Sequence, residues 1–430
     1  MKKFFFIFIL FLSVFSLSSI LSLDTNAINL NSVTIKKGMM DINLQNGKAI
    51  KLKLSNLEIG FLYIGEGNWT AKVEEKYALQ VLKYNLKNGS RLNLEGNTTK
   101  NNFKSAMIFG IEALNNFKGE EIPIDLKFEE DLKRFEREIF DQKLPSPHSY
   151  VLNGIINNFD IFGAIFEGGS DEIIYIYDPF WRKEENLYAL KNSGFKRKGK
   201  ANIKFENLLV NQTIERKREE TFLSPITLKK IDYEIDFTNL SNVLAKFKLE
   251  FLVNYGEFSS IPLNLPNSDY YFRSGGHWEE KFLYVDSINL WDGKEIPYFH
   301  KGDILTLIFP YKFKKGDLVR INILYGGNIF EPTPDMSYYI NLTGLSWFPN
   351  PLQGYESVNC LFSGKLKCKK PFYAFGSFDN FELKEENDIL ILEGKSKYPE
   401  NYHSIAVGKY FPKSKKILDK FDITVASAVF

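Results

Sequence analysis

Hydrophobic and polar positions alternate along much of this chain with a period of two, the pattern of β-strands with one buried face. Residues 231–237 alternate clearly, and residues 246–253 and 318–324 have the composition of strands. The run Glu-Ile-Ile-Tyr-Ile-Tyr at 172–177 predicts a buried strand that ends at Asp178-Pro179. The pattern therefore predicts a chain built mainly of strands.

Short turn signals separate these strands. Asn46-Gly47, Asn88-Gly89 and Asp292-Gly293 each stand between two runs of alternating hydrophobicity. These pairs tolerate the positive φ of a two-residue hairpin turn, so each predicts a hairpin. Residues 304–309 run apolar into Pro310, and residues 315–317 are expected to turn the chain into the next strand. Turns at such short spacing indicate a β-sandwich or a related all-β architecture.

One segment, residues 125–142, has the period of a helix instead. Its apolar side chains recur at steps of four, three and four among charged residues, at Phe128, Leu132, Phe135 and Ile139. That spacing places them on one stripe of a helix. We expect this helix to cover one face of a sheet.

The N-terminus has the order of a secretory signal peptide. Lys2 and Lys3 precede a long apolar run, and small and polar residues follow as far as Ala27. We expect cleavage after Ala27. The alternative is an uncleaved membrane anchor, because residues 4–23 are just long enough to span a bilayer. The signal predicts an exported protein, whether periplasmic, at the cell surface or extracellular, and a membrane partner only if the segment is retained.

Composition supports two folded domains after the signal. Hydrophobic residues make up 44% of the chain, and its 39 Phe and 22 Tyr favour strands. A charged stretch at 215–220 gives way to Ser224-Pro225, and the softest boundary lies there. We expect a signal peptide at 1–27, a β-rich domain at 28–222 and a β-sandwich domain at 223–427. The fold class is mainly β, with two β-sandwich-like or antiparallel β domains and a few short helices.

The charge balance gives no reason to expect a polyanionic partner. The formal net charge is +2, and charges of both signs are interleaved along the chain. Nucleic acid is therefore not predicted as a partner.

The chain has two cysteines, Cys360 and Cys368, on either side of Ser363-Gly364-Lys365. If that tripeptide is a hairpin tip, a disulfide between facing strands is expected in an oxidising compartment. Two free thiols are the alternative that the spacing leaves open. The pair alone is not a metal site, because two further ligands would be needed.

No familiar catalytic motif is present in the sequence. A zinc hydrolase needs two histidines on one helix face with a glutamate between them, and no two of the four histidines lie within four residues of each other. A serine-nucleophile elbow and a phosphate-binding loop are also absent from the sequence. We therefore assign no catalytic and no metal residue and expect no cofactor in this chain. The histidines are His148, His277, His300 and His403.

Three tryptophans in aromatic loop segments are the candidate binding residues. Trp181 and Trp347 stand in Asp-Pro-Phe-Trp and Ser-Trp-Phe-Pro segments, and Trp278 follows a glycine-rich stretch. Such aromatics bind peptides or sugars when exposed, but loop aromatics more often pack beneath a turn. We expect packing at Trp181 and Trp347. Burial of Trp69 and of these three side chains would argue against a binding module.

From about residue 227 onward, the order of features resembles the N-terminal β-domain of the M1 (aminopeptidase N-like) zinc metallopeptidases. Tyr-Glu-Ile-Asp-Phe at 233–237 is similar to that domain's opening strand, and Lys-Gly-Asp at 315–317 begins a stretch similar to its later hairpin. The similar pieces are 233–237, 246–253, 261–265, 285–294, 304–310, 315–327, 347–349, 355–361, 371–376, 402–410 and 422–425. Residues 28–222, with Gly-Glu-Gly-Asn-Trp at 65–69, resemble an extra N-terminal region of some large bacterial proteins of this kind.

The resemblance implies a peptidase partner and no catalysis by this chain itself. Members of the family carry His-Glu-x-x-His in a following catalytic domain, and this sequence has no such motif. We therefore expect a truncated or split gene product, with zinc only in the missing catalytic domain, and a catalytic peptidase domain encoded downstream as its partner. The first alternative is a free-standing exported module that binds peptides or glycans. The second is a glycoside-type hydrolase with two facing carboxylates.

Overall fold

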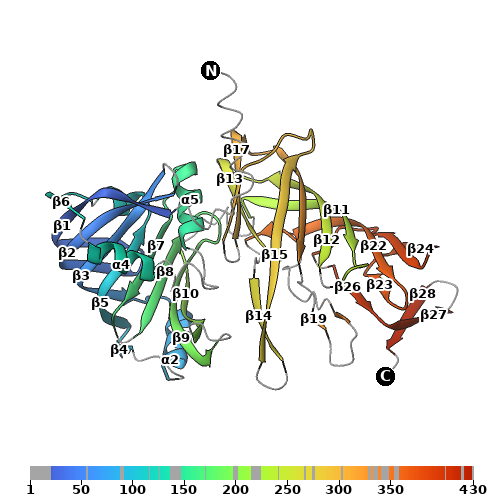
Figure 1. Ribbon diagram of the computed structural model, residues 1–430, viewed down its shortest axis with the longest axis horizontal. Helices are drawn as coiled ribbons and strands as arrows, with labels where there is room; N and C mark the ends of the chain where they lie inside the picture. The colour runs from blue at the N-terminus through green and yellow to red at the C-terminus, as the bar shows by residue number, and fades with distance from the viewer. Residues whose placement is uncertain are drawn as a thin grey trace. The chain divides into compact units, whose positions relative to one another are not determined.

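The computed structural model describes most of the chain after residue 20 (Figure 1). The structure is mainly β, as the period-two pattern predicts, with a few short helices. The chain divides into two compact units. Unit 1 comprises Met1–Thr221 with Phe299–Thr306, and unit 2 comprises Phe222–Tyr298 with Leu307–Phe430. The described residues are 21–54, 57–87, 92–115, 117–124, 126–135, 147–169, 171–196, 202–214, 224–240, 242–265, 268–273, 277–301, 304–327, 331–332, 338–339, 348–352, 358–401, 403–417 and 421–428.

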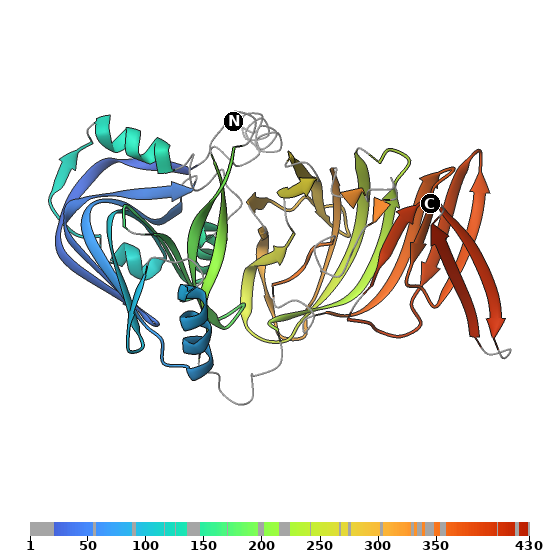
Figure 2. The same ribbon diagram turned by 90° about the horizontal axis from the view of Figure 1, so that it is seen from below.

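Unit 1 is built on one 10-stranded antiparallel sheet. Its order is β10-β9-β8-β7-β5-β3-β2-β1-β6, and β4 pairs with β5 off this path. Figure 2 shows the strong curvature of its long strands, which follows from the right-handed twist of adjacent strands. The strands are β1 (Leu21–Lys37), β2 (Met40–Leu54), β3 (Leu57–Lys72), β4 (Asn93–Glu95), β5 (Thr98–Phe109), β6 (Glu121–Pro123), β7 (Phe162–Glu167), β8 (Glu172–Asp178), β9 (Glu184–Lys196) and β10 (Asn202–Thr213).

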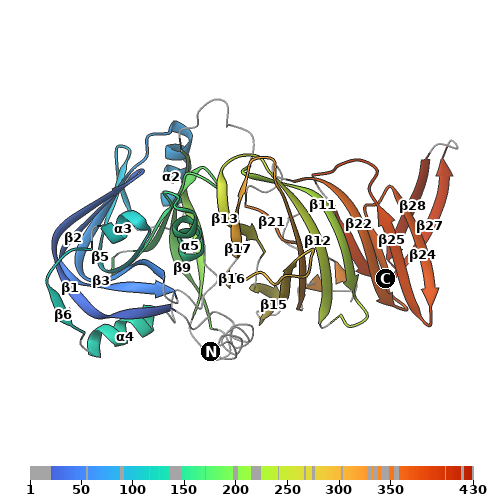
Figure 3. The same ribbon diagram turned by 90° about the horizontal axis from the view of Figure 1, so that it is seen from above.

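Both faces of the central strands are buried. On β3, Phe61 and Tyr63 join a large apolar cluster with Trp69, while Leu62 between them is buried on the opposite face. Such two-sided burial requires cover, and short helices contact the sheet (Figure 3). The helices are α2 (Lys76–Lys87), which contacts β10, α3 (Ile111–Asn115), which contacts β3, α4 (Leu126–Phe135) and α5 (Pro147–Asn157), which contacts β7.

The helix expected at 125–142 is present as α4 over Leu126–Phe135. Phe128, on the expected apolar stripe, is buried. Residues 136–146 lie outside the described part of the chain. The helical spacing of the apolar residues therefore predicts the helix correctly over residues 126–135. The strand expected at 172–177 is likewise present as β8 and is buried.

The hairpin expected at Asn46-Gly47 is wrong. β2 continues through both residues, with a register irregularity between Leu44 and Asn46 against β3. A Cβ on Gly47 would lie 2.5 Å from the Tyr63 ring, so the glycine serves close packing inside the sheet and not a turn.

The hairpin expected around Asn88-Gly89 is also wrong. Residues on its N-terminal side form the helix α2, with Ala78 and Leu82 buried at helical spacing, and residues 88–91 lie outside the described part. Alternation at Leu82, Tyr84 and Leu86 misled the prediction, because Tyr84 is an exposed helix residue. A run this short is ambiguous between the two periods.

The strands after residue 222 form an 8-stranded sheet, two 4-stranded sheets and a 2-stranded sheet. The orders are β14-β15-β18-β12-β11-β22-β25-β24, β16-β17-β13-β21, β19-β20-β26-β23 and β27-β28. The strands are β11 (Ile226–Asp236), β12 (Val243–Val253), β13 (Glu257–Asn264), β14 (Ser268–Arg273), β15 (His277–Leu290), β16 (Tyr298–Lys301), β17 (Ile304–Lys314), β18 (Leu318–Gly327), β19 (Glu331–Pro332), β20 (Tyr338–Tyr339), β21 (Asn350–Pro351), β22 (Val358–Lys369), β23 (Tyr373–Gly376), β24 (Asn380–Glu386), β25 (Ile389–Lys395), β26 (Ile405–Gly408), β27 (Tyr410–Ile417) and β28 (Phe421–Ala428).

Two of the expected turns are confirmed in this half of the chain. Gly293, in the turn after β15, has φ 88°, and Gly316, between β17 and β18, has φ 92°. Only glycine adopts such angles without strain. The strand expected at 246–253 is also confirmed as part of β12, along which every second side chain, from Val243 to Val253, is buried.

The central strands of the 8-stranded sheet have one buried, apolar face and one charged face. Glu234 on β11 lies opposite Lys246 on β12 and opposite Lys365 on β22, where β11 and β22 run parallel. Lys365 in turn pairs with Glu393 of β25 at 2.9 Å. These cross-strand pairs of opposite charge favour the observed register on the solvent side.

Candidate functional site

The two cysteines do not form the expected disulfide. Both are free thiols on the single strand β22, eight residues apart, which corresponds to about 26 Å in an extended strand. No hairpin tip lies between them, because β22 runs through Gly364. A Cβ at Gly364 would lie 2.2 Å from the Tyr233 ring, so this glycine lets an aromatic side chain cross the strand. Burial raises the pKa of Cys368 to about 11 and the pKa of Cys360 further.

The structure describes the side chains of two of the four tryptophans whose burial tests a binding function. Trp181 is 2% exposed and packs against Phe180, so it offers no surface to a ligand, as the packing alternative expected. Trp69 is fully buried. Trp347 and the side chain of Trp278 lie outside the described part of the chain. Both described tryptophans of the set therefore argue against the binding module.

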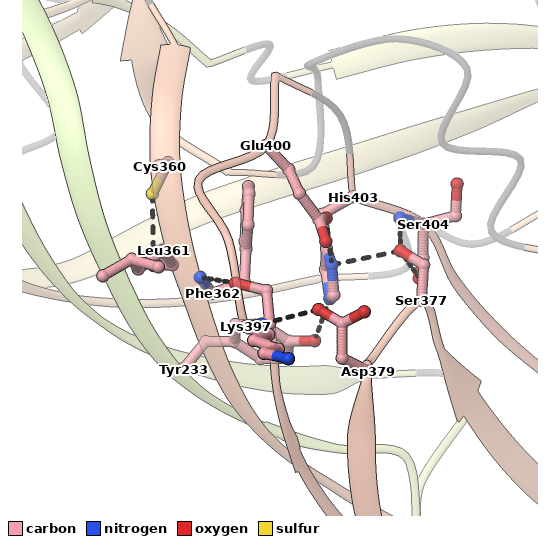
Figure 4. Close-up of polar contacts among 11 residues, drawn as sticks. Tyr233, Cys360, Leu361, Phe362, Ser377, Asp379, Lys397, Glu400, His403 and Ser404 are labelled. Atoms are coloured by element: carbon pink, nitrogen blue, oxygen red, sulfur yellow. Dashed lines mark hydrogen bonds and ion pairs between the residues drawn. The ribbon is translucent and has the colours of Figure 1, made fainter. Parts of the chain in front are cut away.

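A buried polar cluster among the described residues of unit 2 is centred on His403 (Figure 4). His403 lies just before β26, in the segment that returns from β25, and Tyr233 reaches it from β11. Ser377 follows β23, and Phe362 lies on β22. The cluster therefore joins segments up to 170 residues apart in sequence.

Aromatic rings enclose the imidazole. The Phe362 ring stacks on it with centroids 4.4 Å apart and planes 10° from parallel, and Phe378 and Tyr233 approach it at 5.0 and 5.8 Å. The side chain of His403 is fully buried. Burial lowers its pKa to about 4, so the ring is neutral at neutral pH.

Each ring nitrogen has a hydroxyl partner. Tyr233 Oη lies 2.8 Å from Nε2, and Ser377 Oγ lies 3.1 Å from Nδ1. A Glu400 carboxylate oxygen lies 3.7 Å from Nδ1 as well. A carboxylate favours a proton on that nitrogen, so we assign the neutral tautomer with Nδ1–H. Tyr233 then donates to Nε2, and Nδ1–H donates to Ser377 Oγ.

This arrangement does not suit nucleophilic catalysis. A serine nucleophile needs a base that accepts its proton, whereas Ser377 Oγ accepts a hydrogen bond from the ring in this tautomer. The backbone N–H of Ser404 also donates to Ser377 Oγ, at 2.9 Å, so it is not free to stabilise an oxyanion. A histidine pKa of about 4 makes a weak base as well.

The same contacts explain a structural role. The segment before β26 is tied to β22 by two backbone hydrogen bonds between Cys360 and Glu400, of 3.0 and 2.9 Å. Earlier in the same segment, the backbone N–H of Lys397 donates to an Asp379 carboxylate oxygen at 2.6 Å. His403 fills the space beneath this segment and satisfies the buried Tyr233 hydroxyl. The cluster fastens the return segment to the sheet.

A polar cluster in unit 1 is centred on Lys37, at the end of β1. Its ammonium group donates to Glu112, at 2.8 Å, and to Asp160, and it lies 5.0 Å from the centre of the Tyr177 ring. Lys37 is 9% exposed, whereas its carboxylate partners Glu112 and Asp160 are 40% and 66% exposed. Burial opposes the charged form, but the two carboxylates outweigh it and raise the pKa of Lys37.

Asp178, at the end of β8, is a buried acid of unit 1. It is fully buried and accepts backbone hydrogen bonds from Phe180, Trp181 and Arg182, at 3.1, 2.8 and 3.0 Å. Burial raises its pKa to about 6, and these hydrogen bonds only partly oppose the shift. The side chain thus caps the turn that follows β8, at the position where the sequence predicts the strand to end.

The remaining histidines and acids add no metal centre among the described residues, where no group of three or more candidate ligands occurs. Among those residues, no helix is long and apolar enough to cross a membrane. Sequence reasoning overlooked the His403 cluster. Its only local signal was Tyr402-His403 ahead of an apolar run, and nothing near it in sequence reveals that Tyr233 is its partner.

Comparison with known proteins gives similarity to solved structures only. No family model matches the sequence, and no curated protein matches it. A two-domain M1 zinc metallopeptidase mutant bound to L-arginine aligns at 14% identity and a TM-score of 0.37, over 47% of this chain and 46% of that one. An M1 zinc metallopeptidase from Deinococcus radiodurans aligns at 15% identity and a TM-score of 0.35, over 46% of each chain. A further mutant, bound to L-tryptophan, aligns at 13% identity and 0.36, over 50% and 48%.

The chain thus spans about half the length of the solved structures it matches. Identities and TM-scores this low carry no inference about substrate or activity.

Proposed function

We propose that this chain is an exported β-protein that is not itself catalytic, and that its C-terminal half is the β-domain of a peptidase-like system. The chemistry would be supplied by a zinc catalytic domain whose His-Glu-x-x-His motif this sequence does not carry.

One observation carries the proposal. Apart from residues 347–349, the sequence pieces that resemble the M1 β-domain overlap, in order, with strands of the C-terminal half. Residues 233–237 fall at the end of β11, residues 315–327 span the turn into β18 and that strand, and residues 402–410 include β26. A series of local signals that overlaps strands in the same order along the chain is stronger support than any single piece.

The His403 cluster is a second support. It resembles acid–base machinery in its residue types, with a serine and a tyrosine in contact with a histidine. Its hydrogen bonds are directed to each other and to the backbone, as in a structural fastening.

The first experiment measures zinc content and hydrolysis together. The purified chain is assayed on fluorogenic aminoacyl and peptide substrates with added zinc, and bound metal is quantified by native mass spectrometry. We expect no hydrolysis that a chelator abolishes and no retained zinc. Chelator-sensitive hydrolysis by a chain that holds one zinc would overturn the proposal. A His403→Ala variant is the control for unforeseen activity of that cluster.

The second experiment tests export. Fractionation of cells that produce the full chain should place it outside the cytoplasm. A matched variant with Leu10→Arg and Phe11→Arg interrupts the apolar run of the signal segment and should remain in the cytoplasm. Equal distribution of the two proteins would contradict export.

The third experiment tests the partner. A zinc peptidase domain produced from the same genome is mixed with this chain and examined by analytical ultracentrifugation. Co-sedimentation, with hydrolysis by the peptidase domain changed on addition of this chain, is the expected result. Independent sedimentation with unchanged hydrolysis would reject a shared function.

A further inference from the structure

The N-terminal part of β1 is integrated into the sheet before residue 28. β1 starts at Leu21 and pairs with β2 from Leu21↔Leu54 onward, with a register irregularity between Leu23 and Ala27. It also pairs with β6 at Asn26↔Pro123, Ala27↔Ile122 and Ile28↔Glu121. Residues 21–27 therefore contribute to two ladders of the unit 1 sheet.

Side chains add to these ladders. The Lys53 ammonium group donates to Asp24 at 3.0 Å, with both side chains less than a third exposed. Asn26 donates to the Glu121 carboxylate at 3.0 Å. Ala27 is fully buried. The stretch 24–27 thus behaves as part of the folded domain.

Cleavage after Ala27, the position expected from the sequence, would damage this arrangement. It would remove two of the three register pairs that hold β6. It would also place a charged α-amino group on Ile28, which is 3% exposed and lies between Ala49 and Glu121 in the two ladders. A charge that is desolvated in this way is costly unless it is paired.

The sequence offers an earlier site with the same local pattern. Signal peptidases require small residues two positions apart before the cut. Between residues 13 and 27, this pattern occurs at Thr25 and Ala27 and again at Ser16 and Ser18. The earlier pair still leaves an apolar run of ordinary length, from Phe4 to Phe15 with Ser13 inside it.

We propose that the leader is removed between Ser18 and Ser19, so that the mature chain keeps Asp24, Asn26 and Ala27 in β1. This inference rests on the proposed export of the protein. The step is hydrolysis of one peptide bond by a signal peptidase of the exporting cell. Water adds at the Ser18 carbonyl carbon, and the Ser19 nitrogen leaves as the new α-amine.

The mature N-terminus decides between the two sites. The full chain is produced in an exporting host, recovered from outside the cytoplasm and examined by intact mass and N-terminal peptide sequencing. A mature chain that begins at Ser19 is expected. An exported chain that begins at Ile28 overturns this inference and leaves export intact. A chain found only in the cytoplasm with its leader attached overturns both.

Two leader variants test the site directly. Ser18→Phe places a large side chain at the position that must be small, whereas Leu17→Phe changes the tolerant position between the two small residues. We expect Ser18→Phe to abolish the chain that begins at Ser19 and Leu17→Phe to leave it unchanged. Equal processing of both variants would overturn the assignment.

Stability gives an independent readout that needs no export. Chains that begin at Ser19 and at Ile28 are produced directly in the cytoplasm without a leader. We expect the melting temperature of unit 1 to be lower by at least about 5 °C in the shorter chain, because it lacks the ladder pairs and the Asp24–Lys53 ion pair. Equal melting temperatures would remove the physical basis of the inference.

Discussion

Asp178 in unit 1 and His403 in unit 2 are both buried titratable side chains, yet burial moves their pKa values in opposite directions. Burial favours the neutral form of each side chain. It therefore raises the pKa of Asp178 to about 6 and lowers the pKa of His403 to about 4. Asp178 is held by backbone N–H groups, whereas His403 is held by hydroxyl groups and stacked rings. The comparison teaches that the two units should respond in opposite ways to the same acidification.

The largest effect is expected from removal of the imidazole. His403→Ala leaves a cavity against Phe362 and a buried Tyr233 hydroxyl without its partner, so unit 2 should lose about 4 kcal/mol of unfolding free energy. Urea denaturation followed by circular dichroism measures this loss. Ser377→Ala, at the exposed end of the same cluster, should cost less than about 1 kcal/mol. Similar losses in the two variants would show that the cluster is not the fastening described above.

Acid should weaken unit 2 through His403. Its pKa is about 4 in the folded state and 6.5 in a free side chain, so the unfolded state binds more protons between these values. The contribution of the neutral His403 to the unfolding free energy of unit 2 is fully present above pH 6.5. It falls by about 3 kcal/mol as the pH decreases to about 4. The unfolding free energy of the parent relative to a His403→Phe variant, measured across this range, isolates the contribution. A difference that stays constant with pH would contradict it.

Acid should strengthen unit 1 through Asp178 over nearly the same range. The folded pKa of about 6 lies above the ordinary 3.8, so the folded state binds more protons between these values. This contribution is fully present below pH 3.8 and is lost as the pH rises through about 6, by about 3 kcal/mol. Asp178→Asn should remove this dependence, and Asp41→Asn, at an exposed site of the same unit, should retain it. Parallel pH profiles of the parent and Asp178→Asn would refute the opposite response of the two units.

How far the sequence predicted these features depends on the range of the interactions. The strand β8, its end at Asp178-Pro179 and the turns at Gly293 and Gly316 are local features, and neighbouring residues predict each of them. The mainly β class follows from the same local alternation. Signals that involve residues a few positions apart can be read without the fold.

The errors at Asn46-Gly47 and at Ser363-Gly364-Lys365 arise where a distant residue decides the local structure, whereas the error at Asn88-Gly89 arises from a run too short to distinguish a helix from a strand. Gly47 and Gly364 were interpreted as turn residues, but each makes room for a tyrosine ring from another strand, Tyr63 and Tyr233 respectively. The His403 cluster could not be predicted for the same reason, because its main partner is 170 positions away. The resemblance to the M1 β-domain remains a prediction.

The Lys37 cluster differs from both Asp178 and His403, because its groups are charged and its carboxylates are partly exposed. Glu112 and Asp160 can be solvated by water if the ammonium group is removed, since they are 40% and 66% exposed. Lys37→Met should therefore cost only about 1 kcal/mol, and the cost should shrink at high salt. Lys36→Met, a neighbour on β1 that is 74% exposed, should cost almost nothing at any salt concentration. A loss comparable to that of His403→Ala would mean that this pair acts as a fully buried one.

The smallest effect is expected at the cysteines. Cys360 and Cys368 lie on the same strand and are buried thiols with raised pKa values, so a reductant should leave the melting temperature unchanged. A thiol reagent should modify neither residue in the folded protein and both in urea, because the reactive thiolate is suppressed and shielded by burial. Mass spectrometry after brief labelling counts the modified residues. Rapid labelling of Cys368 alone in the folded state would show that the end of β22, where its Sγ donates to the Phe372 carbonyl at 3.1 Å, opens independently of the rest of unit 2.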